Sequence, residues 1–268
     1  MLRDNLSVLP LWESRDHQHR NKSYVYDCLY PVLTSPSQIP PFQLNVPSGT
    51  TVSSILLINL EDDSSEEILP LLVLGGFVVS NIDSDSVMIY PSKTLIPFIS
   101  IKTGVFELVI TSSTKTWYTG AFKMCPNFNN YIKLEFSHSR NIVHSKGLLV
   151  YDNFFINHIY IDPDSYVGKP LYKTEQRIDK REVIELPNQR ISYKLYRFVK
   201  LIPEFMIDII STIDLHDFKY ISYGESRHRI DEIEVESEWL NRGDLTEATF
   251  NVKTDMTIIV DNGKGLII

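Results

Sequence analysis

A repeated alternation of apolar and polar residues in short runs constrains this chain more than any other feature of its sequence. Residues 42–46 and 131–136 alternate in this way, which is the period-two pattern of a strand with one buried face. Prolines recur from Pro31 to Pro97, and a proline inside a helix removes a backbone hydrogen bond and clashes with the preceding turn. The sequence therefore predicts a mainly β fold made of short strands and turns.

One segment, near residues 203–213, has the pattern of a helix instead. Pro203 followed by Glu204 is favoured at a helix start, because the missing proline N–H needs no acceptor there and the carboxylate interacts favourably with the helix dipole. Five apolar residues then fall on one face at helical spacing: Phe205, Met206, Ile209, Ile210 and Ile213. We expect this helix to pack against a C-terminal sheet.

The chain of 268 residues is long enough for two domains, at roughly 100–200 residues per domain. Residues 1–23 are polar and carry both charge signs, so we expect an N-terminal arm that is ordered mainly by a neighbouring subunit, with Trp12 as its anchor. Residues 24–125 are expected to form a β-sandwich-like domain, and residues 126–268 a C-terminal β domain with one packed helix.

The net charge of −8 argues against a phosphate-binding surface, so no sequence-specific nucleic-acid partner is expected. The N-terminus lacks the apolar segment of a secretion signal. The longest apolar stretch, residues 68–80, is interrupted by Pro70, Gly75 and Gly76 and is too short to span a bilayer. We therefore expect no membrane association, and we expect the protein to be made and folded in the cytoplasm.

The sequence contains two cysteines, Cys28 and Cys125. Two buried thiols are the favoured interpretation, and one disulfide between them stays open. The GxxxxGK[ST], GxGxxG, HExxH and GxSxG patterns, which carry phosphate, dinucleotide, zinc and nucleophile chemistry, do not occur. We therefore expect no cofactor, no metal ion and no enzymatic activity.

Two polar clusters allow a functional and a structural interpretation. His17 and His19 lie near Glu13 and Asp16, and they are either metal ligands or part of a solvated, charged arm, which is favoured. Four alternating glutamates share one strand face: Glu232, Glu234, Glu236 and Glu238. They could bind calcium or pair as acid and base, but a solvated face or a charged edge is favoured. A contact with a basic neighbouring subunit is a third interpretation.

Aromatic residues make up 11% of the chain. Most are expected in the core, while exposed ones could form a carbohydrate platform or a subunit interface. The residues that we regard as interface candidates are Trp12, His17, Arg20, Trp117 and Trp239.

The order of these features resembles that of uncharacterised virion proteins of the tail and baseplate region in phages and prophages of Bacteroidota. The residues that carry the resemblance are 11–13, His17, Arg20, 30–31, 41–43, 104–108, 116–122, 131–136, 189–198, 203–205, 238–239 and 243–245. Together they extend over most of the chain. They form an order of features and include no catalytic motif.

The resemblance implies a non-enzymatic structural component of a phage virion, in the tail, baseplate or neck, that acts by subunit assembly. Its partners would be other virion proteins in a multi-copy homo- or hetero-oligomer. The alternative function is a carbohydrate- or receptor-binding β-sandwich module that uses exposed Trp and Tyr, with a glycan receptor as partner. A hydrolase with a dispersed active site is a third and weaker interpretation.

Overall fold

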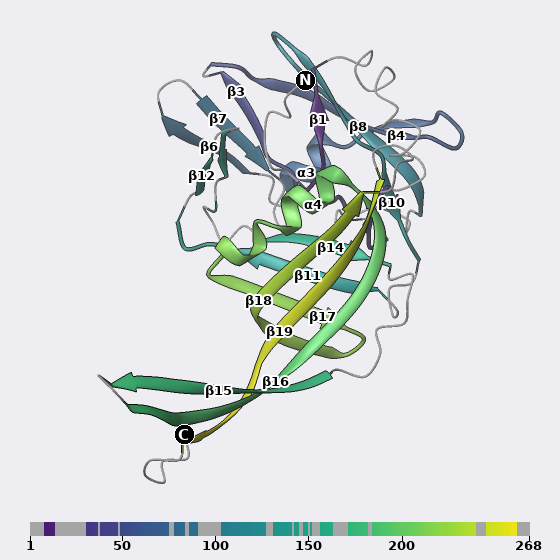
Figure 1. The fold of residues 1–268 in the computed structure, drawn as a ribbon. Coiled ribbons are helices and arrows are strands. Elements are labelled where there is room, and N and C mark those ends of the chain that lie inside the picture. Colours follow the sequence, from purple (N-terminus) through teal and green to yellow (C-terminus); the bar gives the residue numbers. More distant parts are fainter. Residues whose placement is uncertain are drawn as a thin grey trace.

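The computed structural model describes residues 8–13, 31–36, 38–47, 49–74, 78–83, 86–90, 103–126, 131–140, 142–144, 147–149, 151, 156–162, 171–181, 184–239 and 245–261. Strands dominate these residues and form sheets of 14, three and two strands (Figure 1). The prediction of a mainly β fold with one helix packed in the C-terminal half is confirmed.

The large sheet begins with strands from the first half of the chain. In sheet order these are β1 (Leu11–Trp12), β9 (Thr116–Thr119), β8 (Gly104–Ser112), β10 (Phe122–Met124) and β2 (Val32–Thr34), while β4 (Val52–Asn59) pairs with β8 and with β5 (Ser65–Glu67). The small sheets contain β3 (Leu44–Pro47), β7 (Ser86–Tyr90) and β6 (Val78–Asp83), and β12 (Ile142–His144) with β13 (Gly147–Leu149).

The same sheet continues into the second half of the chain. After β2 follow β14 (Asn157–Ile161), β11 (Ile132–Ser137), β17 (Phe218–Tyr223), β18 (Ser226–Trp239), β19 (Leu245–Asp261), β16 (Ile184–Pro203) and β15 (Leu171–Arg181). Strand β2 connects the two halves of the sheet. It pairs in parallel with β10 and antiparallel with β14, where Leu33 is opposite Tyr160. One cluster of buried residues includes both Phe122 and Leu134. The predicted boundary at residue 125 therefore does not separate two cores.

Residues 8–13 of the predicted arm belong to the body of the chain. Val8, Leu9 and Leu11 are buried in the main core, and β1 pairs with β9. The Gly120 N–H donates to the Pro10 carbonyl at 2.8 Å. The expectation of a segment without core residues is wrong here, because the three apolar side chains precede the polar stretch that dominated the composition. Residues 14–23 lie outside the described residues.

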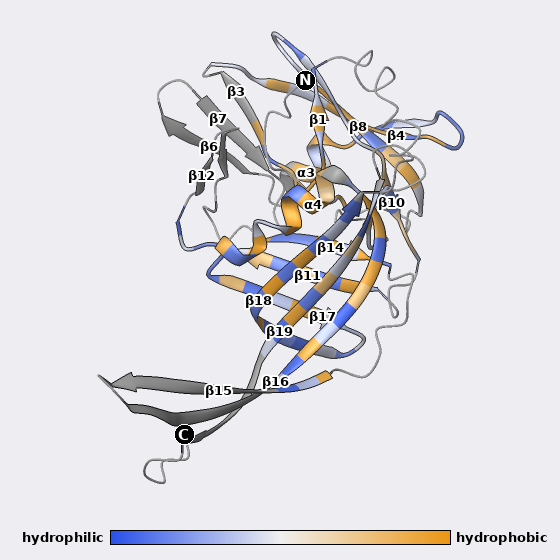
Figure 2. Cartoon of the chain, in the orientation of Figure 1, coloured by the Kyte–Doolittle hydropathy of each residue, from blue (hydrophilic) through white to orange (hydrophobic). Residues whose placement is uncertain are grey.

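The predicted helix is α4 (Glu204–Ile210), followed by a 3₁₀ turn, η2 (Ile213–Leu215). The residues expected on its buried face are buried, except Phe205, which is partly buried against the same core. In Figure 1 the large sheet curves beneath α4, and Figure 2 shows alternating hydropathy along β16, β18 and β19. Phe198 and Phe250, on β16 and β19, stack at 4.7 Å between ring centroids.

A second helix, α3 (Leu69–Leu74), was not predicted. It is six residues long, and its apolar sequence carries no helical period. Glu67 Oε1 accepts hydrogen bonds from the N–H groups of Leu69 and Ile55, at 3.0 and 2.9 Å. Partial burial acts to raise the pKa of Glu67, but hydrogen bonds from Ser54 and these backbone groups outweigh it and lower that pKa. The carboxylate therefore ties the start of α3 to β4.

Replacing Ile209 or Ile210 with alanine should lower the free energy of unfolding by ~2–5 kcal/mol, because each side chain is buried at the helix–sheet contact and truncation leaves a cavity. Urea unfolding followed by circular dichroism measures this loss. Leu215→Ala is the control, since that side chain is 65% exposed and its loss should change stability little. Equal effects at positions 210 and 215 would contradict the packing described for α4.

Candidate functional site

A pocket of ≈ 220 Å³ lies where the sheet folds back on itself, between β2, β10 and β14 on one side and the end of β16 with α4 on the other. Its apolar lining comes from Pro31, Leu33, Ile161, Leu201, Ile202, Pro203 and Met206, and its polar lining from Lys123, Tyr131, Tyr160, Asp162 and Lys200. Pro203 is the last residue of β16 and the N-cap of α4, so this corner fixes one wall of the pocket.

The strand register places the pocket residues. Leu33 is directly opposite Lys123 on β10 and Tyr160 on β14, so the three form a row across neighbouring strands. Lys200 is on β16 and shares a strand face with Phe198 and Ile202, because alternate residues point to the same side. Both of these neighbours are buried, so Lys200 lies on the core-facing side of β16, and its side chain is half-buried.

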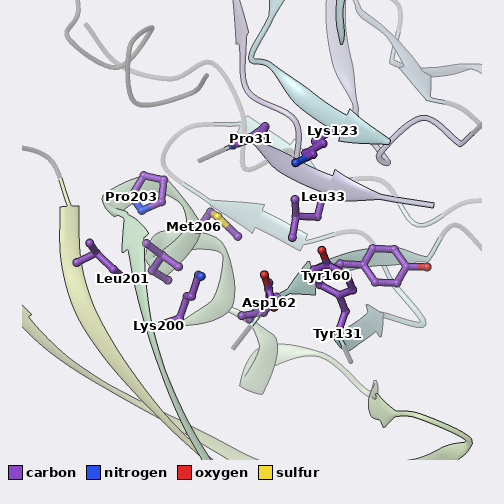
Figure 3. Close-up of a pocket in the computed structure, with 12 residues that line it drawn as sticks. Pro31, Leu33, Lys123, Tyr131, Tyr160, Asp162, Lys200, Leu201, Pro203 and Met206 are labelled. Atoms are coloured by element: carbon purple, nitrogen blue, oxygen red, sulfur yellow. The ribbon is translucent and has the colours of Figure 1, made fainter. Parts of the chain in front are cut away.

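Figure 3 shows the ammonium groups of Lys123 and Lys200 and the carboxylate of Asp162 directed toward the same space. Among the described residues, the lining thus carries two ammonium groups and one carboxylate. Tyr131 lies beside them, and burial, followed by the charges of Cys125 and Asp162, raises the pKa of its phenol to about 12. The phenol therefore keeps its proton at neutral pH.

Cys125 is a buried free thiol, as favoured from the sequence, whereas Cys28 lies outside the described residues. Burial raises the pKa of its thiol above the usual value. The Tyr131 hydroxyl donates to Cys125 Sγ at 4.0 Å. A thiol held in the protonated form is a poor nucleophile, so Cys125 is not activated for covalent chemistry.

A buried polar network lies below η2. The Tyr151 hydroxyl bonds His216 Nε2, Asn157 Nδ2 donates to Tyr151 Oη at 3.3 Å, and His216 Nδ1 bonds the Thr212 carbonyl at 2.8 Å. A carbonyl can only accept, so Nδ1 carries the proton and Nε2 accepts from Tyr151. Burial lowers the pKa of His216 to about 4, which agrees with a neutral ring.

Beside this network, Ser139, His138 and Asp217 bring together the residue types of a hydrolytic triad. The Ser139 hydroxyl, however, donates to Asp217, and so does its backbone N–H, at 3.1 Å. His138 Nε2 is 3.4 Å from the other oxygen of Asp217, and His138 Nδ1 accepts from the Arg140 N–H at 3.0 Å. Among the described residues, no imidazole is bonded to the Ser139 oxygen, so this arrangement ties a turn to the start of β17 and does not activate Ser139 as a nucleophile.

The structure does not bring the predicted interface residues together in one site. Trp117 is 4% exposed in the core of its own chain, so its assignment as an interface residue is wrong: it lies on the core-facing side of β9. Trp12 is half-buried and contacts the Gly120 region. Trp239 ends β18 opposite Thr246, and its side chain is not described. His17 and Arg20 lie outside the described residues.

The alternating glutamates of β18 are exposed, as favoured from the sequence. Lys253 on β19 lies 3.5 Å from Asp231 and 3.9 Å from Glu232. Within the described residues, no group of three or more His, Cys, Asp or Glu side chains could hold a metal ion. The pocket and the His216 network were not predicted from the sequence. Their residues come one at a time from distant parts of the chain and belong to no recognisable motif.

Searches with protein-family models and against curated proteins and solved structures find no match to this chain. None of the helices in the described part of the chain has the length and hydropathy to cross a membrane.

The pKa of His216 predicts acid sensitivity. Its folded-state pKa of about 4 lies below the usual value of 6.5, so below pH 6.5 the unfolded state takes up a proton that the folded state does not. Stability should fall between pH 6.5 and 4 by up to about 1.4 kcal/mol per pH unit for this group. Urea unfolding at several pH values measures the slope, which should be smaller in His216→Gln.

Tyr151→Phe is the control for this prediction. It removes the donor to His216 Nε2 and should cost about 1–3 kcal/mol. Because burial is the main cause of the lowered pKa, the slope with pH should persist in this variant. A slope that His216→Gln leaves unchanged would contradict the neutral buried imidazole.

Proposed function

We propose that this protein is a non-enzymatic structural component of a phage virion and that it acts by subunit assembly. The observation that carries the assembly role is the strand β15, which ends the large sheet. It pairs with β16 from Leu171 opposite Leu195 to Arg181 opposite Ile184. Among the described residues, no strand pairs with its other edge. Placement in a tail, baseplate or neck is supported by the resemblance in sequence features.

Strand addition from a partner is possible along the length of β15, where the edge begins with apolar side chains and then becomes charged. Folded proteins usually shorten, bend or cover edge strands, because the unpaired N–H and C=O groups recruit other strands. Strand β15 has 11 residues and begins with two exposed large side chains, Leu171 at 52% and Tyr172 at 71% exposure. Main-chain bonding along such an edge, with apolar anchors beside it, is a common mode of protein recognition.

The position of β15 supports the same proposal. In Figure 1, β15 and the paired ends of β16 and β19 extend beyond the body of the molecule. A ribbon of few strands is marginally stable in water without a further surface to cover it. A neighbouring subunit that covered this ribbon would offset the entropy lost in ordering it.

The carbohydrate-binding alternative uses exposed tryptophans and tyrosines, and the burial of Trp117 removes one of the three tryptophans. The hydrolase interpretation required a nucleophile with an adjacent base. Ser139 donates to a carboxylate, and the Cys125 thiol is held protonated, so neither meets that requirement. Assembly through β15 is the function that the described geometry supports best.

The double variant Leu171→Asp with Tyr172→Asp tests this function. Both side chains are exposed in the isolated chain, so its melting temperature should not change. Incorporation into particles should fall sharply, because losing apolar anchors of this kind costs ~2 kcal/mol or more, roughly a 30-fold loss of affinity. Quantitative mass spectrometry of purified phage particles, made with each variant, measures incorporation.

Leu215→Asp is the matched control, since Leu215 is as exposed as the β15 pair but lies on η2. Normal incorporation of the β15 double variant would exclude β15 as the contact surface. Absence of the wild-type chain from the particles would refute the virion role itself.

A further inference from the structure

The charges of β15 form a pattern that its pairing with β16 does not use. Basic and acidic residues alternate at every second position of this strand: Lys173, Glu175, Arg177 and Asp179. The register places these four residues opposite uncharged ones on β16, which are in the same order Tyr193, Ile191, Gln189 and Leu186. Opposite charges at directly facing positions stabilise an antiparallel strand pair, and β16 offers none at these four positions. The alternation is therefore suited to a strand on the other edge of β15.

The other edge of β15 is accessible to a second copy of the same chain. Among the described residues no strand pairs with this edge, and Figure 1 shows β15 at one edge of the ribbon that extends beyond the body of the molecule. Two copies of one strand that pair in antiparallel orientation are related by a twofold axis, so residue i faces residue j and j faces i. Such a pair is favourable only when the strand is self-complementary around that axis.

Strand β15 is self-complementary around Gln176. With the twofold axis at this residue, the facing positions on the two copies lie at equal distances before and after it. The charged and aromatic residues then face one another as follows: Lys173 with Asp179, Glu175 with Arg177, and Tyr172 with Lys180. Each pair occurs twice because of the symmetry, so both halves of the contact gain opposite charges and an ammonium group beside an aromatic ring.

Moving the axis by one residue in either direction removes this match. An axis at Glu175 places that glutamate opposite its own copy and Lys173 opposite Arg177. An axis at Arg177 places that arginine opposite its own copy and Glu175 opposite Asp179. An axis between residues 175 and 176, or between 176 and 177, pairs no charge with its opposite. Like charges at facing positions destabilise a strand pair, so the charge pattern selects the register centred on Gln176.

We propose that β15 pairs with β15 of a second copy of this chain, in antiparallel orientation with the twofold axis at Gln176. The inference rests on the proposed assembly through β15 and names the partner of that strand. The contact joins the two ribbons into one continuous sheet, which adds strands to a ribbon that is marginally stable alone. The exposed Tyr172 then faces Lys180 of the second copy, where the ring and the ammonium group attract each other.

Sedimentation equilibrium of the full-length chain measures the contact directly. Between about 1 and 100 µM the wild type should show a monomer–dimer equilibrium, because a contact along one strand is smaller than a standard stable interface and binds weakly. A wild-type chain that stays monomeric over this range would overturn the dimer. The assembly role is judged separately by incorporation into particles, where β15 would then pair with a different protein, so the two proposals fail independently.

Charge reversals at the central pair test the register. Glu175→Arg places an arginine opposite Arg177, and Arg177→Glu places a glutamate opposite Glu175, on both sides of the axis. Each variant should therefore dimerise at least about tenfold more weakly than the wild type. An equimolar mixture of the two variants restores opposite charges at both central pairs and should associate as the wild type does. The double variant, which carries both changes, should also dimerise as the wild type does.

Glu225→Arg is the matched control. It makes the same change in net charge as Glu175→Arg, at an exposed position in the turn before β18, so its dimerisation should equal that of the wild type. Circular dichroism checks that each variant is folded. Equal weakening by these two variants would show a net-charge effect and overturn the contact. Single variants that dimerise normally, or whose mixture fails to associate, would show another surface or another register and overturn it as well.

Discussion

The packing of α4 onto the curved sheet is the contact on which the C-terminal half depends. A helix of seven residues is not stable alone in water, so α4 exists because its apolar side chains are buried. The same segment continues into η2, where Asp214 accepts a hydrogen bond from the Ile233 N–H of β18 at 3.0 Å. It also carries His216 into its polar network and places Met206 in the wall of the pocket.

Polar groups near this core divide into two kinds. His216, Tyr151 and Asn157 bond one another and the backbone, which is the arrangement that makes buried polar groups tolerable and gives a core one defined packing. Lys200 is a half-buried charged residue at the edge of a cavity.

The long strands connect these parts to the molecular surface. Strands β16 and β19 contribute Phe198 and Phe250 to the core and then continue into the ribbon that ends with β15. Because β16 and β19 each run through both body and ribbon, a contact made at the ribbon is joined to the core by these two strands, which have a register shift between Tyr193 and Leu195. Along β18 the exposed glutamates give the outer sheet face a negative charge that disfavours contact with another acidic surface.

Local pattern alone was enough to predict the mainly β fold, strands such as β11 and the helix α4. The alternation at 131–136 became β11, and the apolar spacing after Pro203 became α4, because the 2.0 and 3.6 residue periods follow from backbone geometry. The buried segment at 8–13, the burial of Trp117 and the pocket could not be predicted in this way. Lys123, Asp162 and Lys200 meet only through strand register and the fold-back at β2. Contacts so distant in sequence are decided by the packing of the whole chain, which no local period encodes.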